Sequence, residues 1–170
     1  MTPFGWLIAT SLAALGAAAS AFSHPLPRFI WNASASVPIG LYAVHPVGTL
    51  EIAELVVVRP PRALARFLAD RHYLPMGAPM LKRVLALPGQ TVCRTDHAIT
   101  VDDIAMGDAL DRDGRGRPLP VWQGCKHIPN GQVFLMNWQS EHSFDGRYFG
   151  LLPRAAIAGR ADPVWTQEDD

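Results

Sequence analysis

The sequence has no excess of charge of either sign. Its 15 Lys and Arg residues balance 15 Asp and Glu residues, and the basic residues are scattered along the chain. Proteins that bind nucleic acid ordinarily carry a basic patch or stripe that meets the phosphates. We therefore expect no nucleic-acid partner.

Motifs that bind metals or nucleotides are also missing. The six histidines, at positions 24, 45, 72, 97, 127 and 142, form no HxxxH pair, and the two cysteines form no CxxC pair. Such spacings are typical of metal sites. The sequence also contains no glycine-rich phosphate loop. We therefore expect no metal and no cofactor.

Charged residues are absent from residues 4–22. A helix rises about 1.5 Å per residue, so this segment has the length to cross the roughly 30 Å hydrocarbon core of a bilayer. Two interpretations of residues 1–23 stay open. They form a retained anchor that contacts membrane lipid through residues 4–22, or a cleavable signal peptide, because Ala19-Ser20-Ala21 has the small-residue pattern of a cleavage site. Both interpretations export the rest of the chain.

Cysteine is scarce, since the chain has only Cys93 and Cys125. An even number of cysteines in an exported chain favours a disulfide between them. Two unpaired buried thiols are the alternative. A catalytic cysteine is disfavoured, because neither residue lies in a recognisable Cys/His signature.

Length and turn residues indicate the fold class. A chain of 170 residues is expected to form one domain. Its 15 prolines and 14 glycines interrupt the chain after position 24, which is typical of short strands joined by turns. We predict a mainly β fold, with an antiparallel β-sheet domain over residues 24–166. An N-terminal apolar helix precedes this domain, and a disordered acidic tail over residues 167–170 follows it.

One short amphipathic helix is predicted over residues 62–74, as scaffold or lid, because apolar residues recur there at helical spacing before Pro75 and Gly77. Strands are predicted over residues 41–47, 54–59, 80–87, 91–94, 98–101, 132–137 and 156–161. We expect the first two strands to form a hairpin. A polar hairpin is predicted at residues 111–117.

Ser36 is a candidate nucleophile in the string Ser36-Val37-Pro38-Ile39-Gly40. Pro38 fixes one backbone angle after the serine and Gly40 permits an unusual one, so the segment can hold a tight, exposed turn. A serine hydroxyl also needs a base within hydrogen-bond reach. Taken alone, the string is more typical of an ordinary turn.

Lys82 is the candidate base, because it lies inside the apolar run of residues 80–87. In a strand, Lys82 and Arg83 point to opposite faces, so one of these two cations must face apolar neighbours. Loss of solvent favours a neutral amine, which can accept a proton. The alternative is a lysine that snorkels to water at a strand edge.

A third string, Ser143-Phe144-Asp145-Gly146-Arg147-Tyr148-Phe149-Gly150, completes a pattern. The three strings have the order and rough spacing of type I signal peptidases. From about residue 30 to residue 165 the chain resembles the plasmid-transfer, TraF-like branch of that family. The resemblance implies a signal-peptidase-like fold and a serine/lysine dyad, with Ser36 as nucleophile and Lys82 as base.

The resemblance also assigns supporting residues. It implies that Ser143 hydrogen-bonds the Lys82 amine, and that the Ser34 hydroxyl joins the Ser36 amide in an oxyanion hole. Asp145 and Arg147 are expected to form an ion pair that holds the Ser143 segment. His142, beside Ser143, is an alternative base, although an ordinary surface histidine is the simpler interpretation.

The chain departs from the wider family at three places. Gly146 replaces the usual serine between Asp145 and Arg147, and Asn137-Trp138-Gln139 replaces a GDN tripeptide. Ser36 precedes its proline by two positions rather than three, which we associate with the plasmid-transfer branch. The support of the site near Trp138 therefore cannot be copied from general signal peptidases.

The resemblance implies a membrane-associated endopeptidase that removes leader peptides from exported proteins. It would lie at the bacterial inner membrane with its catalytic domain in the periplasm. A conjugative pilin precursor, cleaved or cyclised, is the expected substrate, and other conjugative transfer components are expected partners. Two alternatives stay open: a non-catalytic periplasmic docking module of the transfer apparatus, and a housekeeping signal peptidase.

Overall fold

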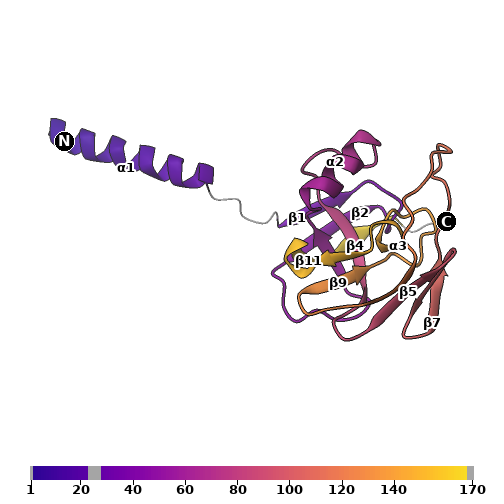
Figure 1. Cartoon of the computed structure of the whole chain (residues 1–170). Coiled ribbons are helices and arrows are strands. Elements are labelled where there is room, and N and C mark those ends of the chain that lie inside the picture. The colour runs from indigo at the N-terminus through magenta and orange to yellow at the C-terminus, as the bar shows by residue number, and fades with distance from the viewer. Residues whose placement is uncertain (1, 23–27, 168–170) are drawn as a thin grey trace.

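The computed structural model describes residues 2–22 and 28–167, so the expected acidic tail lies outside the described residues except for Gln167. The N-terminal segment forms helix α1 (Pro3–Phe22), which is drawn apart from the sheets in Figure 1. Among the described residues, no helix combines the length and the apolar character needed to cross a membrane. The anchor expected at residues 4–22 is therefore not confirmed.

Residues 28–167 form two antiparallel sheets, which confirms the mainly β fold (Figure 1). The larger sheet has the strand order β1-β2-β11-β3-β4-β9-β10. Its strands are β1 (Phe29–Asn32), β2 (Gly40–His45), β3 (Leu55–Val58), β4 (Met80–Ala86), β9 (Gln132–Leu135), β10 (Leu151–Pro153) and β11 (Ile157–Thr166). The smaller sheet has the order β7-β6-β5-β8, from β5 (Thr91–Thr95), β6 (Ala98–Val101), β7 (Ile104–Asp108) and β8 (Gly124–His127).

The hairpin expected between residues 41–47 and 54–59 is wrong. Strand β11 lies between β2 and β3 and pairs antiparallel with both. Because β11 comes from the end of the chain, the local pattern around residue 50 contains no information about this pairing. Strands β1, β7, β8 and β10 were not predicted. For β7 and β8 the reason is that most of their side chains are exposed, so neither has an alternating apolar pattern.

Helix α2 (Arg62–Asp70) is shorter than predicted. His72 has φ 57°, in the left-handed region, which ends the helix although the apolar spacing continues to Leu74. The helix acts as scaffold, because its Phe67 packs with its ring centroid 5.4 Å from that of Phe144, and Tyr73, just beyond the helix, packs 5.3 Å from the same ring. Helix α2 thereby supports the segment that also carries Ser143. The remaining short helices are α3 (Gly146–Phe149) and the 3₁₀ helix η1 (Arg154–Ala156).

The larger sheet is buried on both faces around β4. Met80 and Val84 belong to one apolar core, and Leu81 belongs to another that includes Val37. Alternation along a strand places Lys82 on the same face as Met80 and Val84. Val37, which directly follows Ser36, packs in the core on the opposite face, with Leu81.

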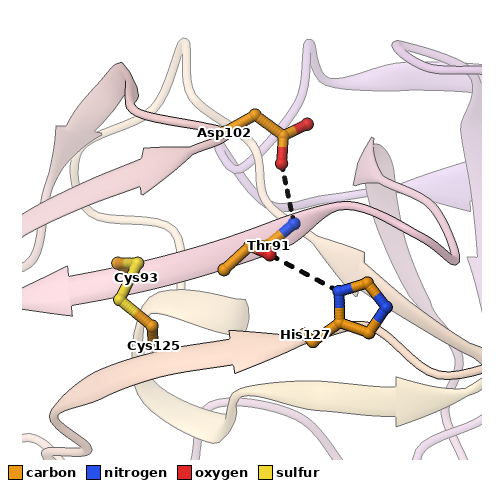
Figure 2. Close-up of a disulfide and its surroundings, with 5 residues drawn as sticks. All are labelled: Thr91, Cys93, Asp102, Cys125 and His127. Atoms are coloured by element: carbon orange, nitrogen blue, oxygen red, sulfur yellow. Dashed lines mark hydrogen bonds between the residues drawn. A yellow bond between two sulfur atoms is a disulfide. The ribbon is translucent and has the colours of Figure 1, made fainter.

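The predicted disulfide is confirmed. Cys93 on β5 and Cys125 on β8 are direct cross-strand partners, and their sulfurs are bonded (Figure 2). In the same sheet, Asp102 accepts a 2.8 Å hydrogen bond from the Thr91 amide. Gln90 connects this sheet to the end of β4, because it donates to Asp102 at 2.9 Å and accepts from the Leu87 amide at 3.0 Å.

Candidate active site

Lys82 lies in the middle of β4 with its side chain 4% exposed. Arg83 is only partly buried and donates from Nη1 to the Ala53 carbonyl at 3.0 Å. Of the two adjacent cations, Lys82 is therefore the one that faces apolar neighbours. Its burial excludes the alternative that the amine snorkels to water.

Burial lowers the pKa of Lys82 from 10.5 to about 8, because the apolar surroundings favour the neutral amine. The charge of Asp145 opposes this change by raising the pKa, and the charge of Arg147 lowers it. A lysine with this pKa is neutral in a large fraction of molecules at mildly alkaline pH. It can therefore act as a base, which an exposed lysine does poorly.

The Lys82 amine is oriented by one buried hydroxyl. Nζ donates to Ser143 Oγ at 2.8 Å, and Ser143 is 2% exposed. This hydrogen bond joins two groups that are 61 residues apart in the chain. It has the partners that the family resemblance implied.

Asp145 and Arg147 form a buried, bidentate ion pair, and both residues are 1% exposed or less. Arg147 Nε donates to Asp145 Oδ1 and Nη2 donates to Oδ2, both at 2.9 Å. Nη2 also donates to the carbonyls of Ser140 at 2.7 Å and Ser143 at 3.1 Å. The pair therefore fixes the backbone that presents the Ser143 hydroxyl to Lys82.

The turn around Ser36 is organised by Asn32, at the end of β1. Asn32 is 8% exposed, and its Nδ2 donates to the Ser34, Val37 and Pro38 carbonyls at 2.7, 3.0 and 3.1 Å. Its Oδ1 accepts from the Ser34 hydroxyl at 3.0 Å. Sequence reasoning missed this residue, because an asparagine before a turn is not distinctive on its own.

Ser36 is partly buried, and its Oγ lies 3.0 Å from Ser34 Oγ in a hydrogen bond. The turn also contacts the Ser143 segment, because Ser140 Oγ donates to the Ala35 carbonyl at 3.2 Å. The structure thus brings Ser36 together with Ser34, and Lys82 together with Ser143. Within residues 28–167, no hydrogen bond joins Ser36 directly to Lys82.

The unusual Gly146 has a steric explanation. A Cβ at this position would lie 2.6 Å from the Leu135 carbonyl oxygen and 2.7 Å from the Phe134 ring. Trp122 also donates from Nε1 to the Gly146 carbonyl at 3.0 Å. The serine usual in the wider family would therefore force the neighbouring strand and ring to move.

The remaining candidates contribute less. His142 is exposed, and none of the hydrogen bonds among the described residues involves its ring, so the structure gives it no place in the site. Across the same residues, no group of three or more His, Cys, Asp or Glu side chains is arranged to hold a metal ion.

Comparison with known proteins defines the class. The family described as signal peptidase, peptidase S26, matches residues 1–166. The chain therefore belongs to the signal peptidase family S26.

Its relatives include proteins of plasmid and conjugal transfer. The chain is 35% identical over 145 residues to the probable conjugal transfer protein TraF of Sinorhizobium fredii, covering 79% of this chain and 76% of that protein. It is 32% identical over 144 residues to the plasmid transfer protein TraF of Escherichia coli, covering 79% and 81%. A signal peptidase I structure from Enterococcus faecalis matches with a TM-score of 0.41 at 18% identity, over 67% of this chain and 97% of that one. Family membership rests on the sequence matches.

Proposed function

We propose that this chain is a serine endopeptidase with a Ser36/Lys82 dyad. In this mechanism the neutral Lys82 amine takes the proton of the Ser36 hydroxyl while Oγ attacks the scissile carbonyl. The peptide C–N bond breaks, the leaving amine takes the proton from Lys82, and the acyl group stays on Ser36 as an ester. Lys82 then deprotonates a water, whose oxygen attacks the ester carbonyl. The bond between the acyl carbon and Ser36 Oγ breaks, and the proton on Lys82 returns to Oγ.

One observation carries this proposal: the family's lysine position holds a buried amine with a lowered pKa. Lys82 is 4% exposed, its pKa is about 8, and Ser143 orients it. A structural lysine gains nothing from such a site, because burial of its charge costs free energy. A base that works near physiological pH requires it.

The reaction requires the Ser36 hydroxyl to leave Ser34 and to come within hydrogen-bond reach of the Lys82 amine. Catalytic hydrogen bonds are often absent or long until substrate is bound. The Ser36 amide and the Ser34 hydroxyl, once its proton leaves Asn32 Oδ1, would be the two donors of the proposed oxyanion hole. The Ser36 amide makes no hydrogen bond to another described residue, so it is available for this purpose.

We further propose that the substrate is an exported conjugative pilin precursor, since two relatives carry the names of transfer proteins. The catalytic domain would face the periplasm, with residues 1–23 as anchor or signal segment. The Cys93–Cys125 disulfide supports this location, because disulfides persist in oxidising compartments. Other transfer components would then be its neighbours.

The test is a cleavage assay with the full chain in detergent, using a pilin precursor and an unrelated preprotein. The proposal predicts cleavage of the pilin precursor, little cleavage of the other protein, and no product with Ser36→Ala or Lys82→Ala. Equal cleavage of both substrates would indicate a housekeeping enzyme. No cleavage of either would indicate a docking module. Mass spectrometry separates hydrolysis from cyclisation, because a cyclic product lacks one water.

A further inference from the structure

Asn137 lies beside Lys82 at the point where β9 ends. The ladder between β4 and β9 includes the pair Val84 and Leu135, and the Met136 amide donates to the Arg83 carbonyl at 2.9 Å. Beyond this point the backbone of residue 137 no longer follows β4. Asn137 is 2% exposed, and from this point its side chain makes the hydrogen bonds to β4 that a strand backbone would make.

The Asn137 amide bonds the residues on both sides of Lys82. Oδ1 accepts from the Arg83 amide at 2.9 Å, and Nδ2 donates to the Leu81 carbonyl at 3.2 Å. A primary amide has one carbonyl acceptor and two N–H donors, and it can present the oxygen and one N–H to the same side, as the C=O and N–H of a strand residue do. On the other edge of β4, Lys82 itself pairs with Val56 of β3. The backbone of Lys82 is therefore fixed from both sides.

Asn137 also contacts the ion pair. Its backbone amide donates to Asp145 Oδ2 at 3.0 Å, the same oxygen that accepts from Arg147 Nη2. One residue thus connects the strand that carries Lys82 with the carboxylate beside Ser143.

We propose that Asn137 is a positioning residue for Lys82, which aligns the base by replacing a missing strand residue and by linking β4 to Asp145. This inference rests on the proposed function, in which Lys82 is the base. It also accounts for Asn137-Trp138-Gln139 in place of the family's GDN tripeptide. The asparagine side chain supplies a support that a glycine at this position could not supply.

The chain offers a direct readout, because its only lysines are Lys82 and Lys126. In a Lys126→Arg parent labelled with ¹³C-lysine, the single lysine signal reports the pKa of Lys82 without any need for activity. Asp145 and Arg147 are the charged groups that act on this pKa. Substitution of the Asn137 side chain changes neither of them.

Asn137→Ala should raise the pKa of Lys82 from about 8 by roughly one unit, because water would reach the loosened strand. It should also lower kcat about 10- to 100-fold with KM little changed, as expected when a catalytic group is displaced. Asn137→Ser, which keeps a smaller side chain able to hydrogen-bond, should give intermediate values. This milder variant serves if Asn137→Ala does not fold.

Gln90→Ala is the matched control, because Gln90 is another amide that joins two segments, away from Lys82. It should lower the Tm without changing kcat or the Lys82 signal. A lowered Tm with unchanged kcat and unchanged Lys82 pKa in both Asn137 variants would overturn the positioning role. Absence of cleavage by the parent itself would instead contradict the proposed function, while the NMR comparison would still decide the role of Asn137.

Discussion

Ser143 holds the amine of Lys82 through a buried 2.8 Å hydrogen bond, and the carbonyl of the same serine accepts a hydrogen bond from Arg147. Ser143 thus lies between the proposed base and the ion pair that supports it. The Asp145–Arg147 pair acts on Lys82 in two ways, since it positions Ser143 and its two charges change the pKa of Lys82 in opposite directions.

Ser143→Ala should lower both kcat and the pKa of Lys82. The substitution removes the hydroxyl that accepts from Nζ, and a hydrogen bond from an ammonium is stronger than one from a neutral amine. The acidic limb of the kcat/KM profile should therefore move below pH 8, and kcat should fall about 10- to 100-fold because the amine loses its orientation. Thr95→Ala, at an exposed strand position, should leave both kcat and the acidic limb of the kcat/KM profile unchanged. An unchanged acidic limb and kcat in Ser143→Ala would contradict the role of this serine.

Stability should depend on pH through Lys82. The pKa of Lys82 is about 8 in the folded protein against 10.5 for a free lysine, so the unfolded chain binds more protons between these values. The wild-type free energy of unfolding should therefore gain about 3 kcal/mol from this residue as the pH rises from 8 to 10.5. At lower pH this contribution is lost, because the folded state then carries a buried charge.

The measurement compares urea unfolding of wild type and Lys82→Met across this pH range. Other titrating groups contribute equally to both proteins, so the difference isolates Lys82. The Lys82→Met protein should be more stable below pH 8, and its advantage should shrink as the pH rises. A difference that does not change with pH would mean that Lys82 titrates like an exposed lysine.

Gly146→Ala should be strongly destabilising. Its Cβ would come within 2.6 Å of the Leu135 carbonyl and press on Phe134, and both belong to the buried strand β9. We expect a loss of about 2 to 4 kcal/mol, as for other overpacked or strained core positions. Gly114→Ala is the control, since a Cβ there meets nothing within 4 Å. Equal urea midpoints for the two variants would show that the packing around Gly146 is looser than described.

The disulfide should stabilise the smaller sheet. Cys93 and Cys125 are 32 residues apart, and closing such a loop contributes about 3 to 4 kcal/mol in the chain-entropy model. The variant with both cysteines replaced by serine should lose roughly this amount in urea unfolding. Thiol titration of the denatured, unreduced wild type should detect no free sulfhydryl. Two free thiols per chain would contradict the bond.

Local sequence patterns predicted the elements around the site better than the sheet that contains them. The apolar run with one lysine correctly indicated a buried strand, because alternation forces one of two adjacent cations inward. The pairing of β11 between β2 and β3 could not be predicted, since it joins segments about a hundred residues apart whose patterns do not specify partners. The helix predicted over residues 62–74 was too long, because the left-handed conformation of His72 that ends it does not interrupt the apolar spacing of the sequence.

Some supporting polar residues were harder to predict than the proposed catalytic ones. Ser36, Lys82, Ser143, Asp145 and Arg147 lie in three strings with a recognisable order, and the family resemblance added Ser34. Asn32 and Asn137 have no such strings. Their importance comes from burial and from hydrogen bonds to backbone groups, which exist only after the chain has folded. The departure at Asn137 was visible in the sequence, but its meaning required the position of β4.

Identification of the residue that carries the acyl group tests the account most directly. The full chain is mixed with a cleavable substrate, quenched in acid within one turnover, digested and analysed by mass spectrometry. The account predicts that the part of the substrate preceding the cut is esterified to the peptide that contains Ser36, and that both this adduct and cleavage vanish in Ser36→Ala. An acyl group on another residue, or undiminished cleavage by Ser36→Ala, would contradict the Ser36/Lys82 mechanism.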